Sequence, residues 1–191
     1  ADVDAQIFLG VPVRNKGKLY NAAAVLNRGE ILGLVPKSYL PNYGEFYEQR
    51  HFVSGLGCLE FMSINGKKIP FGTNLLFVCE ELQELIVAAE ICEDLWVNMP
   101  PSVIHAQAGA NLIVNLSASN EMVGKDSYRR SLVSGQSARL VCGYVYANAG
   151  EGESTQDLVF GGQNMIAENG SILAEGKRFK NGIVYSEIDV Q

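Results

Sequence analysis

The apolar residues of this chain fall into short runs, and this limits the folds that are open to it. The longest unbroken runs have five residues and lie at 22–26, 75–79 and 85–89. A helix needs about 20 apolar residues to cross a bilayer, so none of these runs spans a membrane. Of the 191 residues, 47% are apolar and 19% charged, which is ordinary for a globular protein with a sizeable core. Short runs of this kind predict a fold built on β-strands.

Turn signals divide the chain into expected strands. Asn65-Gly66 is the strongest hairpin signal, and residues 15–17 and 27–29 are further turns that contain glycine. The expected strands are 6–13, 19–26, 30–35, 59–64, 69–71, 75–78, 85–89, 112–116, 143–147, 163–168, 172–174 and 183–188.

Two segments have helical character. Residues 101–109 begin with a proline suited to a first helical turn and end at Gly-Ala-Asn. Residues 125–141 carry a stripe at helical spacing. The expected members of that stripe are Tyr128, Leu132, Val133, Gln136 and Leu140. Strands interspersed with helices and hairpins predict a mixed α/β fold, and the lack of repeats and linkers predicts one compact unit.

The charge and the cysteines exclude several classes of function. With 15 basic and 21 acidic side chains the net charge is −6, which argues against a nucleic-acid partner. Cys58, Cys79, Cys92 and Cys142 are too widely spaced for a zinc site, so we expect no metal. No secretory leader is evident, and the chain is long enough to fold without disulfides. We therefore expect a cytoplasmic protein that has no contact with a membrane.

Cys92 is the first candidate for chemistry. The apolar strand 85–89 runs into it, so the thiol is expected on a sharp connection between strand and helix, where a nucleophile is exposed. A buried structural thiol is the alternative, and we assign it to the other three cysteines. The acidic neighbours Glu90, Glu93 and Asp94 disfavour a thiolate, so a working nucleophile here needs a nearby cation or base.

Lys37 is the candidate cation. It stands directly after Pro36, where the strand 30–35 ends, and opens a segment, 37–50, that is dense in aromatic and ionisable side chains. The alternative is a solvated lysine at a strand end, as for any single lysine.

These residues carry a resemblance to a known family. Lys37 followed by Leu-Pro-x-Tyr-x-Glu, and Cys92 within Ile-Cys-Glu-Asp-Leu-Trp, are similar to the carbon–nitrogen hydrolase (nitrilase) superfamily. More narrowly, PKSYLPNYGEFYEQRHF, EICEDLW, GANLIVNLSASN, YRR and the Gln-Ser-Ala-Arg-Leu helix resemble the glutaminase domain of glutamine-dependent NAD synthetases. The resemblance runs along nearly the whole chain. It implies an αββα sandwich that hydrolyses the side-chain amide of glutamine and passes ammonia to an ATP-using synthetase domain.

The resemblance also implies roles for individual residues. Cys92 matches the nucleophile and Lys37 the lysine of a Glu-Lys-Cys triad, while Glu45 matches a second glutamate that orients the lysine. In this chemistry the thiolate attacks the amide carbon, the ammonium stabilises the oxyanion, and water hydrolyses the thioester.

The expected contacts for substrate follow from the same resemblance. Tyr43, Ser119 and Lys125 fall where the family holds the amino-acid end of glutamine, and Glu93 and Trp96 are expected to wall the pocket. Family members often have arginine where Lys125 stands. Because lysine lacks the bidentate fork, Arg129 or Arg130 could share the contact with the substrate carboxylate.

Parts of the family pattern are expected to lie outside this chain. The general-base glutamate precedes the strand that contains Phe8, so we expect residues 1–191 to be a carbon–nitrogen hydrolase domain that is incomplete at its N-terminus and inactive alone. The synthetase domain, with its needs for ATP, Mg and deamido-NAD, is expected elsewhere in a parent chain. The resemblance further implies a homo-oligomer.

Two other interpretations stay open. The chain could belong to another amidase of the superfamily that acts on a different small amide. It could also be a packing or oligomerisation module in which Cys92 has no catalytic role.

Overall fold

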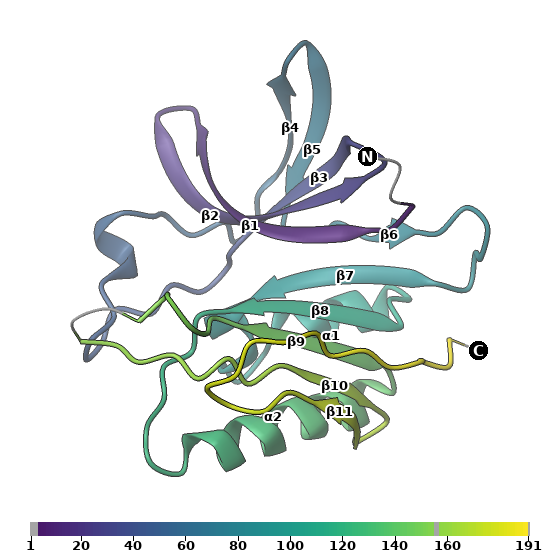
Figure 1. The fold of residues 1–191 in the computed structure, drawn as a ribbon. Coiled ribbons are helices and arrows are strands. Elements are labelled where there is room, and N and C mark those ends of the chain that lie inside the picture. The colour runs from purple at the N-terminus through teal and green to yellow at the C-terminus, as the bar shows by residue number, and fades with distance from the viewer. Residues whose placement is uncertain (1–3, 155–156, 191) are drawn as a thin grey trace. The chain divides into compact units, whose positions relative to one another are not determined.

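The computed structural model describes residues 4–154 and 157–190. Contacts divide the described chain into two compact units. The first unit contains the described residues up to Leu75 together with Ala89–Pro101, and the second contains Leu76–Ala88 together with the described residues from Ser102 onward. Each unit is described separately below, and their elements are labelled in Figure 1.

The first unit is built on a sheet of five strands in the order β1-β2-β3-β5-β4. Its strands are β1 (Ile7–Asn15), β2 (Lys18–Asn27), β3 (Glu30–Pro36), β4 (Leu59–Ile64) and β5 (Lys67–Gly72). Neighbours in this sheet are antiparallel except for β3 and β5, which are parallel, with Leu34 opposite Phe71. The long connection from β3 to β4 contains the 3-10 turn Glu48–Arg50. That connection carries most of the candidate site.

Tight turns set the register of the hairpins. The β4–β5 turn places Asn65 at φ 50° and Gly66 at φ 79°, and the β1–β2 turn has the same pattern at Lys16 and Gly17. Two successive residues with positive φ are the mark of a type I′ turn, whose twist matches that of the strands it joins. The turns expected from the sequence are therefore confirmed.

The core of the first unit lies on one face of this sheet. It is formed by Val13, Tyr20, Ala22, Ala24, Leu34, Ile69 and Phe71. The rings of Tyr20 and Phe71 meet edge to face with their centroids 5.0 Å apart. Asn15 Nδ2, at the β1–β2 turn, donates to Glu60 Oε1 on β4 at 2.6 Å. Since β1 and β4 are at opposite ends of the strand order, the sheet curls around its apolar face.

The second unit contains a sheet of strand order β11-β10-β9-β8-β7-β6. Its elements are β6 (Phe77–Val78), β7 (Ile86–Ile91), α1 (Pro101–Gln107), β8 (Leu112–Ser117), α2 (Lys125–Leu140), β9 (Gly143–Asn148), β10 (Met165–Glu168) and β11 (Ser171–Glu175). The last residues of β7, from Ala89 on, belong to the first unit, as does Cys92, which directly follows β7. Strands β8 and β9 are parallel, whereas β9, β10 and β11 form antiparallel pairs.

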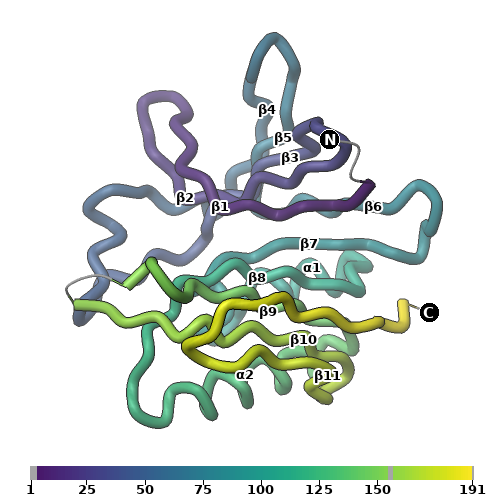
Figure 2. Tube along the Cα trace, viewed as in Figure 1, coloured from purple at the N-terminus to yellow at the C-terminus, as the bar shows by residue number. Residues whose placement is uncertain are grey.

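Helix α2 packs against β9, β10 and β11 and runs alongside the last two in Figure 2. Its buried residues are Arg129, Val133, Gln136 and Ser137. The stripe predicted from the sequence is thus wrong at Tyr128, which is 60% exposed, while the buried face is turned towards Arg129. Burial of Arg129 is possible because its guanidinium bonds to oxygens inside this unit. Gln136 Nε2 also donates to Ser102 Oγ of α1 at 2.9 Å.

Most of the expected strands are present with small changes at their ends, but residues 183–188 are an exception. They form no strand within the described part of the chain. Ile183 and Tyr185 are 91% and 86% exposed. Two hydrogen bonds hold the residues that follow this segment, since Asn111 Nδ2 donates to the Val190 carbonyl at 3.0 Å and Glu168 Oε1 accepts from the Asp189 N–H at 2.7 Å. The strand predicted for residues 183–188 is therefore wrong.

None of the helices in residues 4–154 and 157–190 is long and apolar enough to cross a membrane.

We expect the core of the first unit to be sensitive to loss of Phe71, which is fully buried. Phe71→Ala removes the ring that contacts Tyr20 and should lower the free energy of unfolding by about 3–5 kcal/mol. Urea denaturation followed by circular dichroism measures this change. The matched control is Phe61→Ala, because Phe61 lies on the paired strand β4 and is 69% exposed. It should cost less than about 1 kcal/mol. Equal losses for the two variants would contradict the assigned core.

Candidate active site

Cys92 lies at the abrupt change from strand to helix that the sequence predicted. Strand β7 ends at Ile91, and the 3-10 helix Cys92–Leu95 begins at the next residue. Cys92 itself has φ 48°, in the left-handed region. A residue with a Cβ adopts this conformation at a cost of about 1–2 kcal/mol, so the strain marks a position held by its surroundings. The thiol is partly exposed, unlike that of Cys142, which is buried.

The carboxylate of Asp94 joins the segment after Lys37 to the segment around Cys92. Asp94 Oδ1 accepts the backbone N–H of Tyr39 at 2.8 Å and of Ser38 at 3.1 Å. Asp94 Oδ2 accepts the backbone N–H of Ile91 at 2.9 Å. Two stretches of chain more than fifty residues apart thus meet at one side chain that is 2% exposed. The residue before Cys92 and the two residues after Lys37 are fixed by the same group.

Burial raises the pKa of Asp94 from its ordinary 3.8 to about 7. The hydrogen bonds from Ile91 and Tyr39 and the nearby charge of Lys37 act in the opposite direction, because they favour the ionised carboxylate, while the charge of Glu90 raises the pKa further. Desolvation is the largest of these effects. Asp94 therefore titrates closer to neutral pH than an exposed aspartate.

Lys37 is held by a carboxylate that the sequence analysis did not single out. Its Nζ lies 2.5 Å from Glu48 Oε2, and the two side chains are 3% and 14% exposed. Glu48 Oε1 also accepts from Asn21 Nδ2 at 2.7 Å, and the Asn21 carbonyl accepts the N–H of Lys37 at 2.8 Å. A buried cation paired in this way is fixed in position. Glu48 thus pairs with the lysine that Glu45 was expected to orient, and the role of Glu45 stays a prediction.

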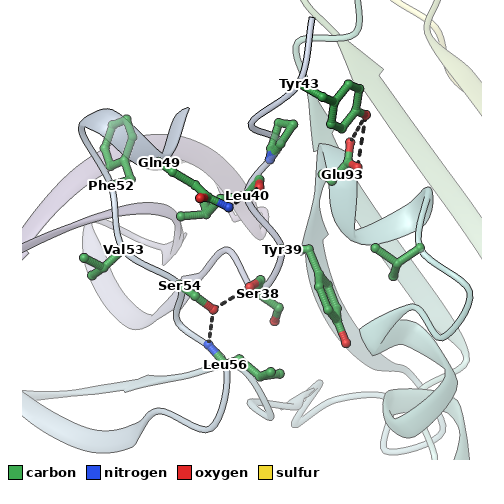
Figure 3. Close-up of a pocket in the computed structure, with 12 residues that line it drawn as sticks. Ser38, Tyr39, Leu40, Tyr43, Gln49, Phe52, Val53, Ser54, Leu56 and Glu93 are labelled. Carbon is green, nitrogen blue, oxygen red and sulfur yellow. Dashed lines mark hydrogen bonds between the residues drawn. The ribbon is translucent and has the colours of Figure 1, made fainter. Parts of the chain in front are cut away.

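Tyr43 and Glu93 point toward one another in Figure 3. The Tyr43 hydroxyl donates to the two carboxylate oxygens of Glu93 at 3.0 and 3.1 Å. Desolvation, followed by this hydrogen bond and the negative charge of Glu93, raises the pKa of Tyr43 to about 12. The ring of Tyr43 packs edge to face on Phe46, with centroids 5.8 Å apart. The bond ties the loop after β3 to the turn that begins at Cys92.

A cavity of about 560 Å³ lies beside this cluster (Figure 3). It is lined by Ser38, Tyr39, Leu40, Pro41, Tyr43, Gln49, Phe52, Val53, Ser54, Leu56, Glu93 and Val97. Its wall is stabilised by Ser54, whose hydroxyl donates to the Ser38 carbonyl at 2.5 Å and accepts the Leu56 N–H at 3.1 Å. Tyr43 and Glu93 are among the lining residues, whereas Cys92 and Lys37 are not. The expected substrate contacts of Tyr43 and Glu93 stay predictions. Trp96 is partly buried, and the lining residue on its turn is Val97 instead.

The remaining expected site residues belong to the second unit. Ser119 is 2% exposed, and its N–H donates to Asn148 Oδ1 at 2.8 Å. Lys125 begins α2, and its ammonium donates to Asn120 Oδ1. Ser119 thus lies between β8 and α2, and Lys125 is the first residue of α2. Their contact with substrate stays a prediction.

Arg129 and Arg130 have different surroundings. Arg129 is fully buried, and its two terminal nitrogens donate to four oxygens of this unit, while its buried Nε has no hydrogen-bond partner among the described residues. The side chain of Arg130 is 54% exposed and pairs with Glu175 Oε2 at 3.0 Å. A share of either arginine in holding the substrate carboxylate stays a prediction.

Comparison with known proteins gives one matching family. The chain matches the carbon-nitrogen hydrolase family over residues 3–191. The glutamine-dependent NAD(+) synthetase of Mycobacterium tuberculosis is 48% identical over 190 residues, which are 100% of this chain and 28% of that protein. That of Aquifex aeolicus is 33% identical over 188 residues, or 98% of this chain and 29% of that protein. The chain therefore spans less than a third of the length of these curated relatives.

Solved structures agree with the expected fold. A glutamine-dependent NAD(+) synthetase from Cytophaga hutchinsonii superposes with a TM-score of 0.81 and 31% identity, covering 94% of this chain and 29% of that chain. A carbon-nitrogen hydrolase from Helicobacter pylori G27 reaches a TM-score of 0.74 at 20% identity, covering 98% of this chain and 62% of that chain, which speaks for the fold alone. The α/β sandwich of the nitrilase type predicted from the sequence is confirmed.

The raised pKa of Asp94 predicts a dependence of stability on pH. Between about pH 4 and pH 7 the native state keeps a proton on Asp94 that the unfolded chain has lost, so this residue's contribution to the free energy of unfolding falls as the pH rises. Above about pH 7 both states are ionised and the contribution is constant. Urea denaturation from pH 4 to pH 8 should show this slope in the native protein and not in Asp94→Asn. Asp157→Asn, at an exposed position, should retain it. A slope that survives in Asp94→Asn would show that another group titrates.

The ion pair between Lys37 and Glu48 predicts that substitutions of Glu48 and Glu45 differ in their effect on the free energy of unfolding. Glu48→Gln leaves the buried ammonium of Lys37 without its carboxylate and should lower the free energy of unfolding by about 3–5 kcal/mol. Glu45→Gln is the matched control, with an expected loss below about 1 kcal/mol. Urea denaturation at pH 7.5 measures both changes. A larger loss in Glu45→Gln would return to Glu45 the role that the sequence assigned to it.

Proposed function

This chain belongs to the carbon-nitrogen hydrolase family, and on that premise we propose that it hydrolyses the side-chain amide of glutamine as part of a glutamine-dependent NAD(+) synthetase. The observation that carries the proposal is the junction at Asp94, where the segment of Lys37 meets the segment of Cys92. A thiol on a strained turn can supply the nucleophile, and a buried ammonium can supply the positive charge, that acyl transfer from an amide needs.

Cys92 acts as the nucleophile in this proposal. Its thiolate attacks the carboxamide carbon, so a C–S bond forms while the carbonyl π electrons move to the oxygen. When the tetrahedral intermediate collapses, the C–N bond breaks, and the nitrogen takes up a proton and leaves as ammonia. Water then attacks the thioester, releasing glutamate and restoring the thiol. The position of Cys92 on a turn, with part of its surface exposed, supports this role.

Lys37 supplies the positive charge beside the developing oxyanion. Preorganised charge is effective because it need not reorient during the reaction. The pair with Glu48 and the backbone bond to Asn21 support this role, since they hold the lysine on both its side chain and its main chain. We also propose that Glu45 is the second family glutamate, which orients Lys37.

The substrate contacts are carried over from the resemblance. Tyr43, Glu93 and Trp96 are proposed to wall the site, and the hydrogen bond between Tyr43 and Glu93 supports this for the first two. Ser119 and Lys125 are proposed to hold the amino-acid end of glutamine, because an ammonium suits an α-carboxylate and a hydroxyl suits an ammonium.

Further parts of the proposal concern the whole protein. The general-base glutamate and a synthetase domain that uses ATP, Mg and deamido-NAD are proposed to lie outside residues 1–191, in keeping with the share of the relatives that this chain covers. The 191-residue chain alone is then expected to be inactive, and the parent to be a cytoplasmic homo-oligomer.

The test is made in the full-length protein. Cys92→Ala should lower glutamine hydrolysis by at least about 1,000-fold, because the residue that forms the thioester is gone. NAD formation from free ammonia should continue, since that reaction bypasses the thiol. A coupled glutamate assay and an ammonium-dependent NAD assay measure the two. Cys79→Ala, at a partly buried thiol of the second unit, is the control and should leave both rates unchanged.

Other outcomes separate the alternatives. If the unaltered protein hydrolyses small aliphatic amides and leaves glutamine intact, the chain is an amidase of another specificity. If Cys92→Ala hydrolyses glutamine at the unaltered rate, the residue is not the nucleophile.

A further inference from the structure

Arg129 is a cation enclosed entirely by its own unit. It lies in the second turn of α2 and is 0% exposed. Its Nη1 donates to Glu121 Oε1 at 2.9 Å and to Gln163 Oε1 at 2.5 Å. A charge removed from water in this way is strongly unfavourable unless its partners are fixed by good geometry. The oxygens around Arg129 are therefore expected to be immobile.

Three consecutive residues of the segment between β8 and α2 bind this one guanidinium. Nη2 of Arg129 donates to the Asn120 carbonyl at 3.0 Å and to Ser119 Oγ at 3.3 Å, and Nη1 donates to Glu121. The planar fork of arginine suits such a set, since its N–H groups point in fixed directions. The segment thus takes its shape from a helix residue that follows it.

This segment and the first residue of α2 carry the two residues proposed to hold the amino-acid end of the substrate, Ser119 and Lys125. The Ser119 hydroxyl is a direct acceptor of Arg129, and Lys125 donates to the side chain of Asn120, whose carbonyl Arg129 also binds. Asn148 supports Ser119 from the other side, accepting its N–H and donating Nδ2 to its carbonyl at 3.2 Å. Arg129 thus reaches Ser119 through one hydrogen bond, and reaches Lys125 through two hydrogen bonds that share Asn120.

We propose that Arg129 is a positioning residue for glutamine, which fixes Ser119 directly and Lys125 through Asn120, and never contacts the substrate. This inference rests on the proposed function. The buried arginine then takes part in recognition of the substrate without contacting the substrate carboxylate itself.

Glu121 orients the guanidinium in turn. It is also approached by Arg178, whose Nη1 lies 3.4 Å from Glu121 Oε2 and whose Nη2 lies 3.1 Å from Asp126 Oδ2. A Cβ added at Gly161 would come within 2.5 Å of Glu121 Oε1, so this glutamate fits closely against the backbone. A shift of Glu121 therefore moves the fork of Arg129.

The experiment compares two lysine variants of α2 in the full-length protein. Arg129→Lys keeps the charge but cannot bond Ser119, Asn120 and Gln163 together. We expect KM for glutamine to rise about 10- to 100-fold while kcat changes less than about threefold, because the substrate is misplaced and the nucleophile is intact. The control is Arg139→Lys, at an exposed position where the arginine donates a hydrogen bond to Gln136 of the same helix, and it should change neither constant.

A second readout separates positioning from general damage to the fold. Iodoacetamide alkylates Cys92 without needing Ser119 or Lys125, so its rate should be unchanged in Arg129→Lys, whereas glutamine should protect the thiol about tenfold less well. Glu121→Gln, which retains an acceptor for Nη1, should shift KM in the same direction by a smaller factor.

The outcomes are distinct. An unchanged KM and unchanged protection in Arg129→Lys overturn the positioning role, and so does an equal loss of kcat, alkylation rate and thermal stability. If the unaltered protein does not hydrolyse glutamine, the proposed function itself fails.

Discussion

The first unit depends on one buried carboxylate that accepts hydrogen bonds from three backbone N–H groups. Asp94 binds Ser38 and Tyr39 from one segment and Ile91 from another. Buried backbone N–H groups need acceptors, and the Asp94 carboxylate supplies them to these three residues. The carboxylate thereby joins the end of β7 to the segment that follows β3. These are the two segments that carry Cys92 and Lys37.

Two buried cations organise the two units in a similar manner. Lys37 has Glu48 as its carboxylate and Arg129 has Glu121, and all four side chains are almost entirely enclosed. Buried ion pairs are weak sources of stability, because desolvation offsets much of the attraction. Their value here is geometric, since each fixes a segment that bears proposed site residues.

The sequence predicted the local features of this fold well. Asn65-Gly66 and the other glycine turns have signatures within two or three residues, and the elbow at Cys92 follows from an apolar strand ending at a thiol. Lys37 and Cys92 were singled out by their motifs, and their catalytic roles stay a proposal. Such features depend on neighbours in the chain and so are visible in it.

The residues that were missed depend on contacts distant in sequence. Glu48 stands three positions after Glu45 in the same segment, and only the 3-10 turn Glu48–Arg50 and the bond to Asn21 distinguish them. Asp94 was noted for its charge near Cys92, but its three N–H partners could not be read from spacing. Residues 183–188 were predicted to form a strand, but the sequence does not show whether a neighbouring strand is present to pair with them.

The left-handed backbone at Cys92 has a consequence for how this family can change over time. Glycine adopts that conformation without a steric penalty, so the fold alone would favour glycine at residue 92 over any residue with a side chain. A lineage that no longer needed the thiol would gain stability by losing it. Retention of cysteine at this position in a sequence is therefore a sign of selection for chemistry rather than for folding.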